Sequence, residues 1–187
     1  IDLKVNKIWH LACPASPSHY QNDPIETAKI SFIGSYNMLN LAKNNRAKIL
    51  FSSSSEIYGD ATNNPQVETN KGSVNTISKR SCYVEGKRIA ETLFFDFHRK
   101  FKIDIKIARI FNCYGPNMLP NDGRVISNFI WQALNNKPLT IYGNGNQTRS
   151  FCYIDDLIDG LLKFMNSNEH GPMNFGNDSE EYTINEL

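Results

Sequence analysis

The 187-residue sequence lacks the features that would assign a protein class at once. No apolar run approaches the roughly 18 residues that cross a bilayer, and no signal-peptide pattern is present. Cysteine is scarce, and Cys13, Cys82, Cys113 and Cys152 form no CxxC pair. The four histidines have no metal-ligand spacing. A net charge of +1 gives no electrostatic reason to bind nucleic acid or an anionic membrane. These absences favour a reduced, cytoplasmic globular protein without a disulfide framework or a zinc site.

Apolar runs and helical periodicities alternate along the first part of the chain. Short apolar runs predict strands at residues 8–12, 48–51 and 103–111, and apolar residues at helical spacing predict helices over 25–44 and 81–101. Strand, helix, strand, helix, strand in this order predicts an α/β fold with a parallel sheet covered by helices. The later part is more broken, and it predicts a smaller lobe with helices at 125–135 and 155–165 and short strands at 139–142 and 151–154.

A row of hydroxyls and one carboxylate, SSSSEIYGD, follows the strand predicted at residues 48–51. In open parallel sheets, ligands bind outside the carboxyl ends of the strands. A flexible linker would not be enclosed by the apolar runs on either side of these serines. A strand-end binding site is therefore the favoured interpretation, and serines that only cap turns are the alternative.

Tyr83 and Lys87, in SCYVEGKR, are four residues apart and share one face of a predicted helix. A phenol titrates near pH ~10, so its use as a base near neutrality needs a pKa about three units lower, or roughly 4 kcal/mol. A nearby ammonium favours the phenolate, and a cationic nicotinamide would add to this effect. Together with a serine hydroxyl, this pair suits hydride transfer from a secondary alcohol to NAD. The alternative for YxxxK alone is a solvated lysine beside a core tyrosine.

Seven segments, in order, resemble the extended short-chain dehydrogenase/reductase family of nucleotide-sugar enzymes, and within it the UDP-glucuronate decarboxylases (UDP-xylose synthases). They are HLACPASPSHY, SSSSEIYGD, NTISKRSCYVEGKRIAET, IARIFNCYGP, DGRVISNF, LTIYGNGNQTRSFCYIDDLIDGL and NFGN. Related 4,6-dehydratases carry an Asp-Glu pair after the catalytic hydroxyl, and epimerases usually carry no carboxylate there. This chain has Ser54-Ser55-Glu56, which matches the decarboxylase pattern except that Ser54 replaces the more usual Thr.

The resemblance implies NAD-dependent decarboxylation of UDP-glucuronate through a C4-keto intermediate, and it suggests a role for each matching residue. The implied catalytic residues are Ser54, Ser55, Glu56, Tyr83 and Lys87. The implied cofactor contacts are Leu11, Ala12, Cys13, Ser52, Ser53, Tyr83, Lys87 and Arg124. The implied substrate contacts are Lys29, Asn112, Tyr142 for the uridine pocket and Arg149 for the diphosphate, with Arg80 as a further candidate for substrate anions. A homodimer through the two long helices is also implied, with Phe94, Phe95 and Phe97 as candidate contacts.

The sequence departs from this family pattern in two places. Ser31 stands where the family carries Asn, and the glycine-rich pyrophosphate turn, with its acidic residue about 20 positions on, is absent. We therefore expect residues 1–115 to be the C-terminal part of a Rossmann-like domain that lacks its N-terminal βαβ portion. Residues 116–187 are expected to form a nucleotide-sugar-binding lobe. The alternatives are a nucleotide-sugar 4,6-dehydratase or 4-epimerase, and a non-catalytic nucleotide-sugar-binding or assembly partner.

Overall fold

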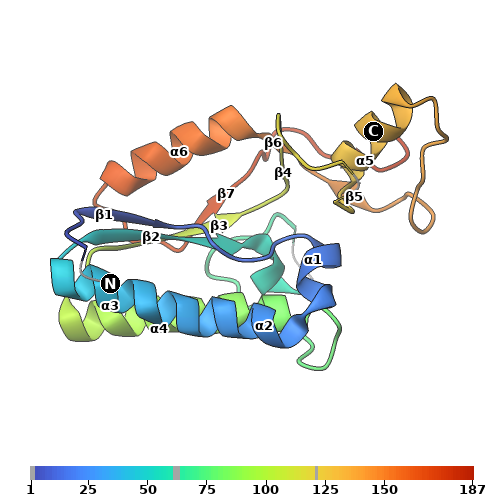
Figure 1. Cartoon of the computed structure of the whole chain (residues 1–187). Coiled ribbons are helices and arrows are strands. Elements are labelled where there is room, and N and C mark those ends of the chain that lie inside the picture. The colour runs from blue at the N-terminus through green and yellow to red at the C-terminus, as the bar shows by residue number, and fades with distance from the viewer. Residues whose placement is uncertain (1–2, 61–63, 121) are drawn as a thin grey trace.

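Four parallel strands form the centre of the fold (Figure 1). The computed structural model describes residues 3–60, 64–120 and 122–187. The strands are β1 (Lys7–His10), β2 (Lys48–Ser54), β3 (Ile105–Ile110) and β7 (Met173–Phe175). They lie in the order β1-β2-β3-β7, and each neighbouring pair is parallel. The predicted α/β fold with a parallel sheet is therefore confirmed.

Helices cover both faces of this sheet, which gives three layers (Figure 1). One face carries α2 (Pro24–Lys29), a π-helix (Ile30–Gly34), α3 (Ser35–Asn45) and α4 (Ser81–Phe101). The other face carries α6 (Ile154–Asn166), and α1 (Pro17–Asn22) lies near one end of α2. Among the described residues, no helix combines the length and the apolar character needed to span a membrane.

The helix predicted over residues 25–44 is one continuous run with a wider turn in its middle. It begins as expected, because Pro24 occupies the first turn and the Asp23 side chain accepts a hydrogen bond from Glu26 N at 2.9 Å. The π-helix Ile30–Gly34 then separates α2 from α3. Such wide turns are rare and are frequently found at functional sites. The run ends where Arg46 adopts a left-handed conformation with φ 52°.

Successive side chains of each strand point to opposite faces of the sheet, and the buried apolar ones form a hydrophobic core on each face. Ile49 and Phe51 of β2 pack with Phe94 of α4, whereas Leu50 packs with Leu157 and its neighbours on α6. Full burial of one such side chain stabilises the fold by about 1.5–3 kcal/mol. Phe94 and Phe97 are buried in the first core, so they are not the dimer contacts that the sequence suggested. Phe95 is only partly buried.

The later part of the chain contains α5 (Val125–Leu134) and two small sheets. β4 (Cys113–Tyr114) pairs in parallel with β6 (Cys152–Tyr153), and β5 (Thr148–Arg149) pairs antiparallel with β8 (Tyr182–Thr183). The strand predicted at 139–142 is wrong, because these residues pair with no strand in the described chain. The segment between β1 and Pro24 contains α1, and β2 continues through the serines to Ser54.

Candidate functional site

A pocket with a volume of about 400 Å³ lies at the carboxyl ends of β2 and β3. This volume is within the range of small-molecule sites, and the position is the one expected for ligands of open parallel sheets. Most of the site residues proposed from the sequence line it: Leu11, Cys13, Ser52, Ser53, Ser54, Ser55, Glu56, Tyr83, Lys87, Asn112, Arg124, Tyr142 and Arg149. The fold therefore brings these residues to one cavity, and their individual roles stay predictions.

Ser54 and Tyr83 meet at the reaction end of this pocket. Ser54 ends β2, Tyr83 lies in the first turn of α4, and the Ser54 hydroxyl lies beside the Tyr83 phenol in the lining of the pocket. The Ser54 hydroxyl oxygen also accepts a hydrogen bond from the backbone N–H of Glu56 at 3.2 Å. Because one acceptor position is used in this way, the hydroxyl proton is left to be donated into the pocket.

Burial raises the pKa of Tyr83 to about 12, although the neighbouring Ser54 hydroxyl opposes the shift. Lys87 was expected to lower this pKa; its Nζ donates to the backbone oxygen of Ser52 at 2.6 Å and lies 5.7 Å from the centroid of the Tyr83 ring. Burial also lowers the pKa of Lys87. In the chain by itself, burial of the phenol is therefore the main influence on Tyr83, and a lowered pKa in the presence of the cofactor stays a prediction.

Three inward-facing residues of α4 hold the end of β2. Tyr83 lies beside Ser54, Lys87 donates to the Ser52 carbonyl, and Glu91 accepts a hydrogen bond from the Ser53 hydroxyl at 2.5 Å. These α4 residues follow one another at intervals of four, so they form one stripe on the helix. Ser53 was proposed to contact a cofactor, but its hydroxyl is engaged by Glu91. The stripe sets how far the Tyr83 phenol lies from the Ser54 hydroxyl.

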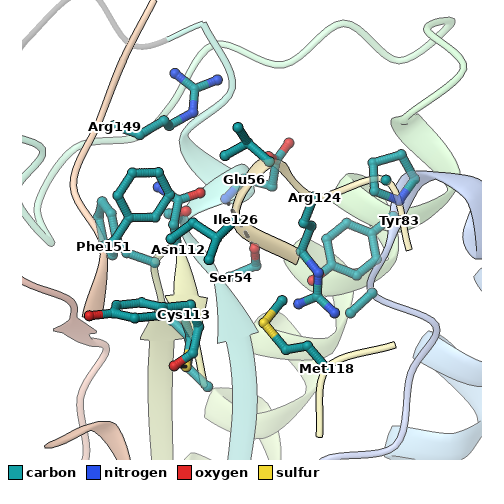
Figure 2. Close-up of a pocket in the computed structure, with 18 of the residues that line it drawn as sticks. Ser54, Glu56, Tyr83, Asn112, Cys113, Met118, Arg124, Ile126, Arg149 and Phe151 are labelled. Atoms are coloured by element: carbon teal, nitrogen blue, oxygen red, sulfur yellow. Dashed lines mark hydrogen bonds between the residues drawn. The ribbon is translucent and has the colours of Figure 1, made fainter. Parts of the chain in front are cut away.

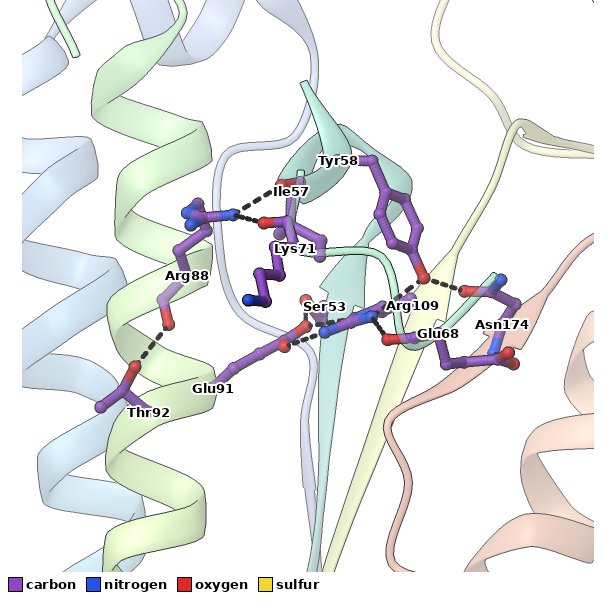
Figure 3. Close-up of polar contacts among 10 residues, drawn as sticks. All are labelled: Ser53, Ile57, Tyr58, Glu68, Lys71, Arg88, Glu91, Thr92, Arg109 and Asn174. Atoms are coloured by element: carbon purple, nitrogen blue, oxygen red, sulfur yellow. Dashed lines mark hydrogen bonds and ion pairs between the residues drawn. The ribbon is translucent and has the colours of Figure 1, made fainter. Parts of the chain in front are cut away.

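Figure 3 shows a polar network that continues from Glu91 through β3. Arg109, the register partner of Ser53, donates from Nε and Nη2 to the two oxygens of Glu91 at 3.0 and 2.8 Å. The same guanidinium donates to the hydroxyl of Tyr58 at 2.9 Å, and that hydroxyl donates to Asn174 of β7 at 2.7 Å. Charge-assisted bonds of this kind are strong and directional. The network ties α4, β2, β3 and β7 together directly beneath the pocket.

The opposite end of the pocket carries residues suited to a nucleotide. Figure 2 shows Arg149 and Tyr83 on opposite sides of the site, with Ser54 and Asn112 between them. Arg149 lies on β5 and is exposed, and its Nη1 donates to the Thr148 backbone oxygen at 2.7 Å. A planar guanidinium on the side of the pocket away from Tyr83 suits a diphosphate, since Arg binds such groups with two parallel hydrogen bonds.

Other proposed residues lie elsewhere or are already engaged. Lys29 and Ala12 are not among the pocket-lining residues, and Lys29 lies 3.7 Å from Glu26 on the exposed side of α2. Arg124 lines the pocket, but its Nε donates to Asp122 at 2.6 Å. Ser31 is buried in the π-helix, and its hydroxyl lies 3.3 Å from the thiol of Cys13.

Tyr20 and Asn128 also line this pocket and were not among the residues predicted from the sequence. The ring of Tyr20 stacks on Tyr83 with centroids 4.9 Å apart. Asn128 lies on α5, and its buried Oδ1 has no hydrogen-bond partner within the described residues. Both residues lie inside segments that carry the family resemblance, SPSHY and DGRVISNF, so a signal for them was available.

The family profile described as "NAD dependent epimerase/dehydratase family" matches residues 2–176, and the chain belongs to this family. The chain is 55% identical over 185 residues to UDP-glucuronic acid decarboxylase 3 of Arabidopsis thaliana, with 99% of this chain and 54% of the relative covered. It is 51% identical over 182 residues to UDP-glucuronic acid decarboxylase 1 of Xenopus tropicalis, with 97% and 43% covered. The chain thus spans about half the length of these curated relatives.

Solved structures of the same architecture include enzymes that act on nucleotide sugars. A UDP-N-acetylglucosamine 4-epimerase from Methanobrevibacter ruminantium superposes with a TM-score of 0.88 at 30% identity, covering 96% of this chain and 57% of that one. A UDP-glucuronic acid 4-epimerase from Bacillus cereus, in complex with UDP-glucuronic acid and NAD, superposes with a TM-score of 0.83 at 28% identity, covering 97% and 57%. The similarity to the decarboxylases is therefore higher in sequence than the similarity to these epimerases.

Proposed function

We propose that this chain carries the active-site part of an NAD-dependent UDP-glucuronate decarboxylase, which forms UDP-xylose. The observation that carries the proposal is the meeting of Ser54 and Tyr83 at a pocket that also contains Glu56 and Arg149. Curated relatives with 50–55% identity are named UDP-glucuronic acid decarboxylases, which supports the same activity.

The residues around Lys87 fit the nicotinamide end of NAD. Cys13, Ser52 and Lys87 line the pocket beside Tyr83, and Lys87 is the buried cation of this group. NAD, when bound, supplies a hydride acceptor for the sugar C4 and a positive charge that favours the Tyr83 phenolate. The glycine-rich turn that holds the pyrophosphate in this family is not present in these 187 residues. The chain's own contribution is therefore the half of the cofactor site that faces the sugar.

The first chemical task of the side chains is to oxidise the sugar at C4. The Ser54 hydroxyl donates a hydrogen bond to the C4 oxygen, and the Tyr83 oxygen accepts the proton of the C4 hydroxyl as C4 loses its hydride. Lys87 holds the end of β2 through the Ser52 carbonyl, so the two groups keep their spacing. The product is a C4 ketone that lies β to the C6 carboxylate.

The C4 ketone itself accepts the electron pair that is released when carbon dioxide leaves, so no other group has to accept it. The C5–C6 bond breaks, carbon dioxide leaves, and the electron pair of that bond moves into the C4 carbonyl as an enolate. Ser54 and the protonated Tyr83 donate hydrogen bonds to the enolate oxygen and stabilise it. A proton then reaches C5 by way of Glu56, which lines the same pocket. As the hydride returns to C4, the Tyr83 phenol gives its proton back to the C4 oxygen.

Product analysis tests this function against its nearest alternatives. The protein expressed from the complete reading frame that encodes this chain is incubated with NAD and either UDP-glucuronate or UDP-glucose. We expect carbon dioxide and UDP-xylose from UDP-glucuronate, and no reaction of UDP-glucose. A 4-epimerase, which the structural neighbours suggest, would give UDP-galacturonate without carbon dioxide, and a 4,6-dehydratase would act on UDP-glucose. Tyr83→Phe is the matched inactive control.

We also infer that the protein forms a homodimer through α2, α3 and α4. Exposed apolar side chains lie on α2, on α3, on α4 and on the π-helix between α2 and α3: Ile25, Phe32, Ile33, Tyr36 and Ile89. Exposed apolar surface can mark an interaction site, and a two-fold contact is the commonest form of homo-oligomer. Ile33→Glu combined with Ile89→Glu should convert the dimer to a monomer in sedimentation experiments, and a wild-type monomer would contradict the inference.

A cytoplasmic location is part of the same proposal. Cys13, Cys82, Cys113 and Cys152 are all free thiols, as expected in a reducing compartment. Cell fractionation tests this location, and recovery only from a secretory compartment would contradict it.

A further inference from the structure

Arg80 joins two walls of the pocket through one guanidinium. Its Nε donates to the hydroxyl of Tyr20 at 3.0 Å, and its Nη2 donates to Oε1 of Glu56 at 3.2 Å. Its backbone oxygen accepts hydrogen bonds from the N–H groups of Tyr83 and Val84 at 3.1 Å each. Arg80 therefore belongs to the first turn of the helix that carries Tyr83, and its side chain reaches from there to Glu56.

Tyr20 is a firm anchor for this arginine. Only 2% of its surface is exposed, and its ring lies nearly parallel to that of Tyr83, with centroids 4.9 Å apart and an angle of 11°. Because packing fixes the Tyr20 hydroxyl, the Nε contact fixes the plane of the guanidinium and directs its other arm toward Glu56. Lysine carries a single nitrogen at the end of a flexible chain and cannot hold both partners in this way.

Glu56 needs a partner of this kind, because its charge acts against Tyr83. Burial is the main cause of the raised pKa of Tyr83, and the negative charge of Glu56 adds to it. The Glu56 side chain is 38% exposed, so packing alone does not fix its direction. The guanidinium of Arg80, at 3.2 Å from Oε1 of Glu56, holds the carboxylate in one direction.

We propose that Arg80 is a positioning residue for Glu56, held in place by Tyr20, and that it serves the decarboxylation half of the reaction. This inference rests on the proposed function. Removal of hydride uses Ser54, Tyr83 and Lys87, and the Arg80 side chain bonds with none of them among its described contacts. Proton addition at C5 uses Glu56, which Arg80 holds. Loss of the guanidinium should therefore slow proton addition at C5 and the hydride return that follows it, and it should spare oxidation itself.

The experiment separates these two halves in the protein expressed from the complete reading frame. Single turnovers with NAD and carboxyl-labelled UDP-glucuronate give the rates of NADH formation and of its return to NAD by absorbance, and the rate of carbon dioxide release by label. For Arg80→Gln we expect the return of NADH to NAD, which follows proton addition at C5, to slow by about ten- to a hundredfold, while NADH formation and carbon dioxide release change by less than about threefold. NADH and the decarboxylated 4-keto sugar should then accumulate on the enzyme. Arg80→Lys should behave in the same way, and Tyr20→Phe should show a smaller effect in the same direction.

Arg99→Gln is the matched control, since Arg99 lies on the same helix and pairs with exposed Asp96 away from the pocket. Equal losses in the rates of NADH formation and of NADH return to NAD for Arg80→Gln, or rates equal to those of Arg99→Gln, would overturn the positioning role. If Arg80→Gln does not fold, Arg80→Lys and Tyr20→Phe decide by the same ratio of rates. A wild-type protein that releases no carbon dioxide would refute the proposed function and the Arg80 role together. A wild-type protein that does so, with a normal rate ratio in the variants, would refute the Arg80 role alone.

Discussion

Glu91→Gln should weaken the fold far more than the removal of an exposed charge on the same helix. Glu91 accepts two hydrogen bonds from Arg109, at 3.0 and 2.8 Å, and one from Ser53 at 2.5 Å. The side chains of Arg109 and Glu91 are only 9% and 10% exposed. Glutamine keeps the shape of the side chain and removes its charge, so the buried guanidinium is left facing neutral groups.

The size of this effect follows from the contacts that Arg109 retains. Removal of one partner of a buried ion pair costs about 3–5 kcal/mol. Arg109 still donates to the Tyr58 hydroxyl and to the Glu68 backbone oxygen, each at 2.9 Å, so we expect the lower end, about 3 kcal/mol. Asp96→Asn is the matched control. Its pair with Arg99 is 57% and 69% exposed and should contribute only about 0–1 kcal/mol.

Urea unfolding followed by circular dichroism measures both variants, together with Arg109→Gln and the double variant Glu91→Gln/Arg109→Gln. Because the double variant leaves no buried unpaired charge, its loss should fall short of the sum of the single losses by about 0.5–3 kcal/mol. A Glu91→Gln loss within about 1 kcal/mol of the Asp96→Asn loss would refute the reasoning. Strict additivity in the double variant would refute it as well.

Three further predictions concern the base, the nucleotide end and the packing of α4. The pKa of Tyr83, about 12, lies above its ordinary value of 10, so the protonated phenol stabilises the fold below pH 10. That contribution, roughly 3 kcal/mol, should be lost as the pH rises from 10 to 12, and Tyr83→Phe should remove this part of the alkaline unfolding curve. An unchanged curve would contradict the shift. Arg149→Ala should weaken UDP-glucuronate binding by about ten- to a hundredfold in calorimetry, and unchanged affinity would exclude a diphosphate contact. A Cβ at Gly86 would lie 2.7 Å from the Ser31 Cβ, so Gly86→Ala should cost about 1–3 kcal/mol in urea unfolding. Gly34→Ala, which meets nothing within 4 Å, should cost nothing, and equal effects at the two glycines would show that contact with Ser31 is not the cause.

The meeting of Ser54 and Tyr83 could be predicted because it depends on topology more than on detail. Parallel strands with helical crossovers bring their carboxyl ends to one edge, and a four-residue spacing brings Tyr83 and Lys87 to one helix face. Neither inference needs exact element boundaries. The strand was predicted to end at Phe51, whereas β2 continues to Ser54. This error did not change the predicted position of the site.

Other features depend on partners that the sequence does not reveal. Residues 139–142 alternate like a strand, but without a partner strand Leu139 and Tyr142 stay 51% and 68% exposed. The Glu91–Arg109 pair joins a helix to a strand 18 residues later, a separation with no pattern of its own. The raised pKa of Tyr83 depends on burial, which residue spacing does not give.

The π-helix Ile30–Gly34 changes how the long helix should be read by anyone who engineers it. An α-helix turns by about 100° per residue, so a side chain four residues further on points roughly 40° away from the first. After three such intervals, the last side chain would no longer face the same side of the helix as the first. Thr27, Ser31, Ser35 and Leu39 nevertheless all have 2% or less of their surface exposed. The π-helix turns by less per residue than an α-helix, and this cancels part of the rotation between these side chains. Ordinary α-helical winding over the same number of residues would turn one end of this inward row toward water.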